Sequence, residues 1–254
     1  MTGAGFHDDR GAAKLWRKGV LAMTMVLAAA TAAHAASNKD LEERVRALEA
    51  RVQKTEDIDA INKLTRAYGY YVDKAQWNDI VDLFSDDCRV EIAGRGVYRG
   101  REGADTIFRK VMGGGKIGLS QGALFNHMIL QGVVDVAPDG KTAYGRWRAF
   151  IQIGTYQQFG MWAEGTYENI YVKENGVWKF KDLHYFATYY TPYDQGWAKK
   201  AMPNNGPSKE FPPDSPQSVQ YDVFPGHFVP PYHYPNPVTG KPWKPEAAAA
   251  GDKK

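Results

Sequence analysis

The chain has 254 residues, of which 43% are hydrophobic, and its formal net charge is +3. This is enough apolar sequence for one sizeable core, or for one core with tails. The basic residues are scattered rather than clustered, so the composition excludes a basic nucleic-acid-binding face and we expect no nucleic-acid partner. The aromatic content of 13% favours a pocket for a flat apolar ligand, although aromatic side chains also fill cores.

Residues 1–35 have the pattern of a signal peptide. A basic start precedes an apolar run over 20–33, and Ala33-His34-Ala35 matches an A-x-A cleavage site. The run is short for a bilayer span, so we expect no membrane contact once the signal is removed. The sequence therefore predicts a periplasmic or secreted protein whose mature chain begins near Ala36.

Residues 36–55 predict a charged helix. Its apolar residues follow a 4-3-4 spacing, which is a two-heptad seam formed by Leu41, Val45, Leu48 and Val52. Two heptads are too few for an autonomous coiled coil. We expect this helix either to pack on its own domain or to help a subunit contact.

Residues 56–190 predict one α+β domain, because helical periodicity changes to strict alternation near residue 124. Turn sequences at Pro138-Asp139-Gly140 and Glu174-Asn175-Gly176 separate long antiparallel strands. The expected helices are 56–73, 76–86 and 101–112, the expected hairpin is 88–93 with 96–99, and the expected long strands are 124–136, 141–154, 159–173 and 177–190.

Residues 191–254 differ in composition, since 13 of the 14 prolines lie between Pro192 and Pro245. Proline prevents regular sheet and helix, yet a disordered linker would be poor in the aromatic residues found here. We therefore predict an extended arm over 191–244 that wraps over its own domain or a neighbouring subunit, with 246–254 disordered. Exposed aromatics on this scale favour a homo-oligomer, a trimer or a dimer.

Asp73 is an acid within an otherwise apolar helical pattern. A carboxylate on a buried helical face usually has a raised pKa, which suits a base. The alternative is a structural aspartate that ends one helix and caps the next.

His127 lies on one face of the strand predicted over 124–136, between Phe125 and Ile129. A neutral imidazole in a closed pocket can transfer a proton near neutral pH. The alternative is a hydrogen-bonded histidine of the core.

Several short motifs occur in an order that resembles the SnoaL-like and scytalone dehydratase branch of the nuclear transport factor 2-like superfamily. They are Tyr68-Gly69, Asp73, Trp77, Leu83-Phe84, Asp86-Asp87, Gly100-Arg101-Glu102-Gly103, His127 and Gly176-Val177-Trp178-Lys179-Phe180. The resemblance implies a cone-shaped barrel, with three helices packed on a strongly curved, mostly antiparallel sheet that encloses a cavity. It also implies that Asp73 and His127 form a catalytic dyad, in which the carboxylate holds the imidazole ring and raises its basicity.

The match to scytalone dehydratase is incomplete. Val72 stands where that enzyme has a tyrosine, and the stretch 150–153 lacks its second histidine. The differences favour another lyase or isomerase on the same scaffold. The tyrosine-rich first helix and the aromatic tail also resemble the γ-formaldehyde lyases that act on lignin dimers.

Other aromatic and polar residues of these helices and strands are candidates for contacting a substrate. They are Tyr70, Tyr71, Trp77, Phe125, Trp147, Glu164, His184 and Tyr189. Metal-ligand motifs, dinucleotide fingerprints and a serine nucleophile elbow are absent, so we expect no metal and no cofactor.

The predicted function is a cofactor-independent lyase, a dehydratase or a formaldehyde-eliminating enzyme, that acts on a small phenolic or other hydroxylated aromatic substrate. One alternative is a non-catalytic periplasmic module for ligand binding or assembly. Another is an isomerase or cyclase of the ketosteroid isomerase type. The enzyme interpretation requires Asp73 and His127 to meet on one side of the sheet.

Overall fold

The computed structural model describes residues 10–245. The start of the predicted signal peptide, 1–9, and the predicted disordered end, 246–254, lie outside these residues. The chain divides into two units, Met1–Gln53 and Lys54–Lys254. Among the described residues, none of the helices combines the length and the apolar character of a bilayer span. Export and cleavage near Ala36 stay predictions.

The helices predicted over 36–55 and 56–73 are one helix, α1 (Arg10–Asp73). In the first unit the four seam side chains are exposed, between 44% and 57% of their surface. In the second unit the last turns of α1 carry Ile61, Tyr68 and Val72, all buried. The end of α1 is therefore amphipathic in the way that its sequence predicts.

The other helices of the second unit are short. They are α2 (Trp77–Asp82), the 3₁₀ turn η1 (Ala93–Arg95) and α3 (Gly100–Asp105), which continues as the π-helical segment η2 (Thr106–Met112). The helix predicted over 76–86 is too long. It ends at Asp82 because Phe84 already belongs to a strand, where it pairs with Phe180.

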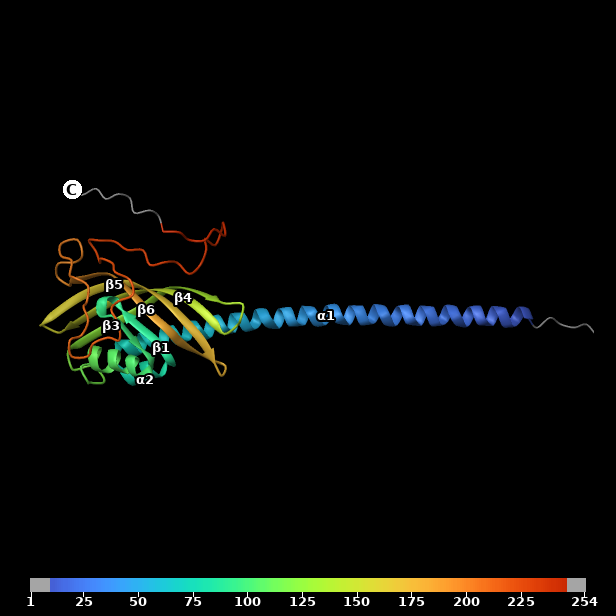
Figure 1. Cartoon of the computed structure of the whole chain (residues 1–254), viewed down its shortest axis with the longest axis horizontal. Helices are drawn as coiled ribbons and strands as arrows, with labels where there is room; N and C mark the ends of the chain where they lie inside the picture. Colours follow the sequence, from blue (N-terminus) through green and yellow to red (C-terminus); the bar gives the residue numbers. More distant parts are fainter. Residues whose placement is uncertain (1–9, 246–254) are drawn as a thin grey trace, which may run out of the picture. The chain divides into compact units, whose positions relative to one another are not determined.

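Six strands form one sheet in the order β2-β1-β6-β5-β4-β3, and Figure 1 shows the sheet curving over the helices. Only β1 and β6 run parallel; the other neighbours are antiparallel. The predicted hairpin and the four long strands are confirmed, and the chain has the α+β class expected. The strands are β1 (Phe84–Ile92), β2 (Val97–Arg99), β3 (Ala123–Val136), β4 (Thr142–Thr155), β5 (Phe159–Glu174) and β6 (Val177–Pro192).

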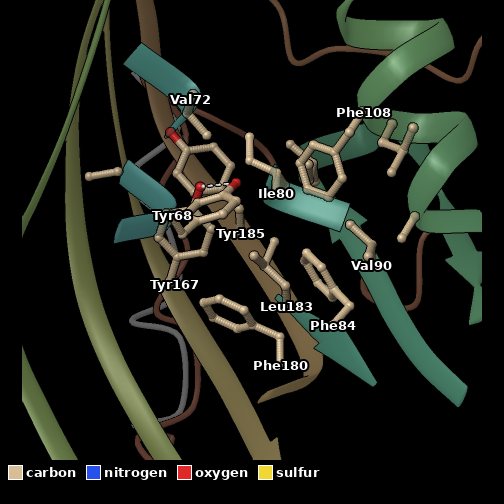
Figure 2. Packing of buried hydrophobic residues seen from close by; sticks show 14 of the residues in the cluster. Tyr68, Val72, Ile80, Phe84, Val90, Phe108, Tyr167, Phe180, Leu183 and Tyr185 are labelled. Atoms are coloured by element: carbon tan, nitrogen blue, oxygen red, sulfur yellow. Dashed lines mark hydrogen bonds between the residues drawn. The ribbon is translucent and has the colours of Figure 1, made fainter. Parts of the chain in front are cut away.

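Aromatic side chains dominate the core between the helices and the inner face of the sheet (Figure 2). Phe84, Phe108 and Phe180 are fully buried, and the ring of Phe84 lies 5.6 Å from that of Phe108 and 5.2 Å from that of Phe180. Tyr68 of α1 packs edge-on against both Phe108 and Phe180. Burying rings of this size supplies most of the stabilisation of the core.

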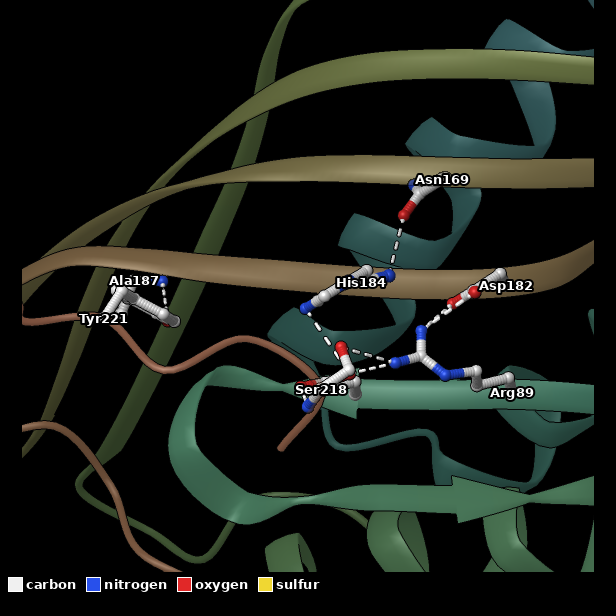
Figure 3. A network of polar contacts seen from close by, with 8 residues as sticks. Arg89, Asn169, Asp182, His184, Ala187, Ser218 and Tyr221 are labelled. Atoms are coloured by element: carbon white, nitrogen blue, oxygen red, sulfur yellow. Dashed lines mark hydrogen bonds and ion pairs between the residues drawn. The ribbon is translucent and has the colours of Figure 1, made fainter. Parts of the chain in front are cut away.

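The proline-rich arm, residues 193–245, packs on its own domain, which confirms one of the two alternatives predicted for it. It covers the outer face of the sheet, where Tyr221 accepts a hydrogen bond from the amide of Ala187 at 3.0 Å. Buried Glu91 of β1 accepts two hydrogen bonds from Ser218 of the arm, which Figure 3 shows beside Arg89 and His184. Whether a neighbouring subunit also contacts the arm stays a prediction.

Candidate functional site

Asp73 and His127 meet on the inner side of the sheet, where the end of α1 crosses β3. The half-buried carboxylate of Asp73 accepts a hydrogen bond from the backbone amide of His127. Gly69 permits this approach, because a Cβ there would lie 2.8 Å from a side-chain carbon of Ile129 and 3.1 Å from the carbonyl oxygen of His127. The pairing of Asp73 with the strand therefore depends on a glycine one turn earlier.

The imidazole of His127 is buried, with only 6% of the residue exposed. Its Nε2 lies 3.0 Å from the hydroxyl oxygen of Tyr167, which lies 3.2 Å from that of Tyr68. Burial lowers the pKa of His127 from 6.5 to about 3. The ring is therefore neutral at physiological pH, and a hydrogen-bonded chain leads from it to α1.

Burial raises the pKa of both Tyr68 and Tyr167, well above 10 for Tyr167, so both are neutral phenols. Each hydroxyl has one proton to donate and also accepts. When Tyr167 donates to Tyr68, it can accept the Nε2 proton of His127, which leaves the lone pair on Nδ1. With this direction of donation, Nδ1 is the basic atom of the ring.

Beside the hydrogen bonds that join His127, Tyr167 and Tyr68, two buried polar atoms have no hydrogen-bond partner within the described residues. They are Nδ1 of His127 and the hydroxyl of Tyr185. The ring of Tyr185 lies 4.9 Å from that of Tyr167. A buried polar group without a partner costs about 1–3 kcal/mol, so each of these atoms requires an explanation, such as a bound molecule or water.

Tyr171, also on the inner face, differs from Tyr185 because its hydroxyl has hydrogen-bond partners within the protein. The hydroxyl of Tyr171 lies 2.8 Å from Oγ1 of Thr65 and accepts hydrogen bonds from Trp147 and Asn169 at 3.0 and 3.2 Å. This cluster satisfies its polar atoms within the protein and is structural. The cluster around His127 instead leaves two polar atoms without a partner among the described residues.

Two predictions about Asp73 are corrected. Its carboxylate was expected to hold the imidazole ring and raise its basicity, but it binds the backbone amide, and the pKa of the ring is lowered by burial. The second part of the alternative, a cap for the next helix, is also wrong, because the residue before α2 is Gln76 and that helix start has no side-chain cap. The first part of the alternative is confirmed, since Asp73 is the last residue of α1. Its carboxylate also binds β3.

Four of the predicted substrate-binding residues lie on the His127 side of the sheet. Trp77 and Phe125 are neighbours, with ring centroids 6.5 Å apart, and Phe125 lies 6.0 Å from the His127 ring. Trp147 belongs to the Tyr171 cluster, and Tyr71 packs partly buried against the core.

The remaining four predicted residues are not beside His127. Tyr70 points away from the core with 73% of its surface exposed. On the outer face of the sheet, Glu164 forms an ion pair with Arg148 and is the register partner of Tyr189. His184 also lies there, stacked on Phe186 under the arm. The predicted grouping of these residues with the dyad is therefore wrong.

A large cavity of about 840 Å³ lies where β4 turns into β5. Trp162 and Tyr193 stack beside it, and its walls include Leu124, Ile153 and Phe159. Asp73 and His127 do not line it. It adjoins the dyad only indirectly, because its wall residue Ile153 is the register partner of Phe125. Its one carboxylate is Asp194, and it contains no histidine, so proton transfer is better supported at His127.

Sequence reasoning missed the hydroxyl-bearing side chains in and beside the hydrogen-bonded network of His127. Tyr68 appeared only as part of a family motif, while Tyr167 and Tyr185 were not singled out. Alternation along 159–173 and 177–190 places both tyrosines on buried faces, which is the only signal that the sequence offers. Within the described residues no group of three or more potential metal-binding side chains occurs.

One buried histidine, His127, and one largely buried histidine, His184, make the protein sensitive to acid. Burial lowers the pKa of His127 to about 3 and that of His184 to about 4. Both pKa values are depressed in the folded state, so the stabilisation from a neutral ring is present above 6.5 and is lost as pH falls below it. We expect the free energy of unfolding to fall by on the order of 1 kcal/mol per pH unit for each ring between pH 6 and pH 5.

Urea unfolding at closely spaced pH values measures this slope. Each of His127→Gln and His184→Gln is expected to remove about half of it. A slope that neither substitution changes would contradict the assignment of buried neutral rings.

The match to a known protein family decides the identity of the fold. Residues 53–184, more than half of the chain, match the family model described as a SnoaL-like domain. The chain belongs to the SnoaL-like family. The matched region begins within α1 and ends in β6, so it includes Asp73, His127 and Tyr167.

Solved structures similar to this SnoaL-like chain are distant in sequence. A provisionally assigned scytalone dehydratase from Novosphingobium aromaticivorans is 19% identical, with a TM-score of 0.49 over 63% of this chain and 97% of its own. A hexachlorocyclohexane dehydrochlorinase, LinA-type3 from Novosphingobium barchaimii, is 22% identical, with a TM-score of 0.49 over 56% of this chain and 93% of its own. The protein Aln2 from a Streptomyces species is 15% identical, with a TM-score of 0.44 over 52% of this chain and 90% of its own.

Proposed function

We propose that this SnoaL-like protein is a cofactor-independent lyase that acts on a hydroxylated aromatic small molecule, with His127 transferring the proton. The observation that carries the proposal is the buried neutral imidazole, bound through Nε2 to Tyr167 and without a partner at Nδ1 among the described residues. Family membership supports it. With the predicted signal peptide, we place the reaction outside the cytoplasm.

The simplest chemistry for such a site is loss of water from a para-hydroxyphenyl alcohol. The base takes the phenolic proton, and the electron pair moves through the ring to expel the benzylic hydroxyl, which leaves as water after protonation. The resulting quinone methide then loses a proton from the neighbouring carbon to the base, which forms the alkene and the phenolate. The base returns this proton to the phenolate oxygen, which restores the phenol. Over the whole sequence one C–O and one C–H bond break and a C=C bond forms.

A related substrate has a hydroxymethyl group on the carbon next to the benzylic position. In that case the quinone methide loses formaldehyde instead of a proton: the O–H proton goes to the base, the C–C bond breaks, and its electron pair forms the alkene. Both outcomes need one residue that accepts and returns protons. Burial alone makes His127 a weak base, so its role in proton transfer requires that the phenolate formed beside it stabilises its protonated state.

The experiment compares two matched substrates, a para-hydroxyphenyl alcohol and its para-methoxy analogue, with alkene absorbance as the readout. Protein dialysed against a chelator is expected to convert the phenol with no added cofactor and to leave the methyl ether unchanged. Equal rates on both substrates, or turnover only after a metal is added, would contradict the proposal. Product analysis for formaldehyde separates the two eliminations.

The second candidate is ligand binding without chemistry, and the cavity at the β4–β5 turn favours it. Its aromatic walls suit a flat molecule, and it contains no histidine. A phenol that raises the melting temperature of the wild type and of a Trp162→Ala variant equally would exclude this cavity as its site. An isomerase or cyclase would use the same histidine and would give a product of unchanged mass, or a ring closure, in the same assay.

A further inference from the structure

The apolar seam of α1 is an exposed face with a definite heptad pattern. Leu41 and Leu48 occupy d positions, and Val45 and Val52 occupy a positions. All four side chains are between 44% and 57% exposed in the first unit. Valine at a with leucine at d is the combination that favours two-stranded parallel coiled coils.

The charged residues that flank the seam indicate whether two copies of the helix would pair in parallel or antiparallel. Glutamates occupy the e positions, Glu42 and Glu49, and arginines occupy the g positions, Arg44 and Arg51. In a parallel pair each g residue faces the e residue of the next heptad, so Arg44 of one copy meets Glu49 of the other. In an antiparallel pair e faces e and g faces g, which places like charges together.

A polar residue extends the same pattern. Asn38 lies seven residues before Val45, at the preceding a position, and is exposed. Asparagine at one a position fixes the register of a coiled coil and favours dimers, because only an aligned partner asparagine satisfies its amide.

We propose that the exposed face of Asn38, Leu41, Val45, Leu48 and Val52 binds a second copy of the same chain as a parallel, in-register, two-stranded coiled coil. The occupant is a second copy because the e and g charges complement those of an identical helix. This inference is independent of the proposed function.

A seam of two heptads is short for a coiled coil, but this one lies on a helix that is already formed. An isolated two-heptad peptide would have to form its helix on binding, and that cost makes such peptides marginal. Here the seam is a part of α1, which continues as a helix beyond the seam to Asp73. The pairing therefore needs little ordering of the backbone, although the small apolar area predicts a dimer whose population depends on concentration.

Disulfide trapping tests the register. The only cysteine, Cys88, is buried, so a cysteine introduced on the seam is the accessible thiol. We expect Val45→Cys to form a covalent dimer on mild oxidation, because a positions face each other within disulfide range. Ala50→Cys, at the exposed f position on the opposite face of the helix, is the matched control and is expected to stay monomeric on a non-reducing gel.

A mixture of Leu41→Cys and Val52→Cys tests the orientation. The parallel arrangement gives only disulfides between identical residues, since positions 41 and 52 lie about 16 Å apart along a helix. A disulfide between residues 41 and 52 of different chains would overturn the parallel assignment. Failure of Val45→Cys to cross-link faster than Ala50→Cys would overturn the interface itself.

Charge reversal tests the specificity. Arg44→Glu is expected to weaken dimerisation roughly 3- to 30-fold by light scattering across a dilution series, because each dimer loses two ion pairs. The double variant Arg44→Glu, Glu49→Arg is expected to restore it, since the pair is rebuilt with exchanged signs. No rescue, or a mass of three chains for the wild type, would contradict the two-stranded pairing.

Discussion

His127→Gln is expected to reduce turnover of a para-hydroxyphenyl alcohol by ~10²–10⁴-fold while the protein stays folded. The substitution removes the atom that accepts the proton, but glutamine keeps a polar group that can bond to Tyr167. The readout is the rate of alkene formation at saturating substrate, with far-UV circular dichroism to establish that the fold persists. The effect should fall on kcat, because the histidine acts on the reaction and contributes little to ground-state binding.

His184→Gln is the matched control for this experiment. His184 is also a largely buried histidine with a lowered pKa, but it lies on the outer face of the sheet beneath the arm. Its loss is expected to leave turnover within a few-fold of the wild type. Folded His127→Gln protein with wild-type turnover would refute the proton-transfer role, and an equal loss in both variants would point to a general effect of destabilisation.

Asp73→Ala is expected to cost on the order of 10²-fold in turnover, because the imidazole shifts when its backbone anchor is lost. Asp73→Asn is expected to recover much of this loss, since an amide oxygen also accepts the hydrogen bond from the His127 amide. A charge relay to the ring would give the opposite pattern, in which asparagine is as harmful as alanine. The two substitutions therefore distinguish a positioning residue from a carboxylate that tunes the ring.

The double variant Asp73→Ala, His127→Gln gives a further readout. If Asp73 acts only by positioning His127, the double variant should be little slower than His127→Gln alone. Losses that multiply would show that Asp73 has a separate role. A similar unfolding free energy for Asp73→Ala and Asp73→Asn would show that their difference in rate is not a difference in stability.

The sequence predicted the strands well and the second helix poorly, for physical reasons. Glycine-containing turns such as Glu174-Asn175-Gly176 fix where long alternating segments begin and end, and β5 and β6 agree with the prediction within two residues. The helix over 76–86 was extended too far because Phe84 suits an apolar helical face as well as a strand. Its pairing with Phe180, nearly a hundred residues later, decides the outcome.

The site could be predicted only in part. The pairing of Asp73 with His127 was found from the order of motifs, but the face on which each strand residue lies depends on register. His127 pairs with Ile151, and Ile151 pairs with Ala163, so Glu164 must point to the opposite face. Tyr167 could not be identified as a site residue from the sequence, because a tyrosine at an alternating position of a strand is as typical of a core as of a functional site.

The most direct measurement is a crystal structure of the protein with an unreactive para-hydroxyphenyl ligand. The proposed mechanism predicts a polar atom of the ligand about 2.6–3.2 Å from Nδ1 of His127, with the Nε2 contact to Tyr167 retained. A ligand bound only between Trp162 and Tyr193 in the cavity at the β4–β5 turn, with the His127 ring untouched, would contradict it and would favour the binding module.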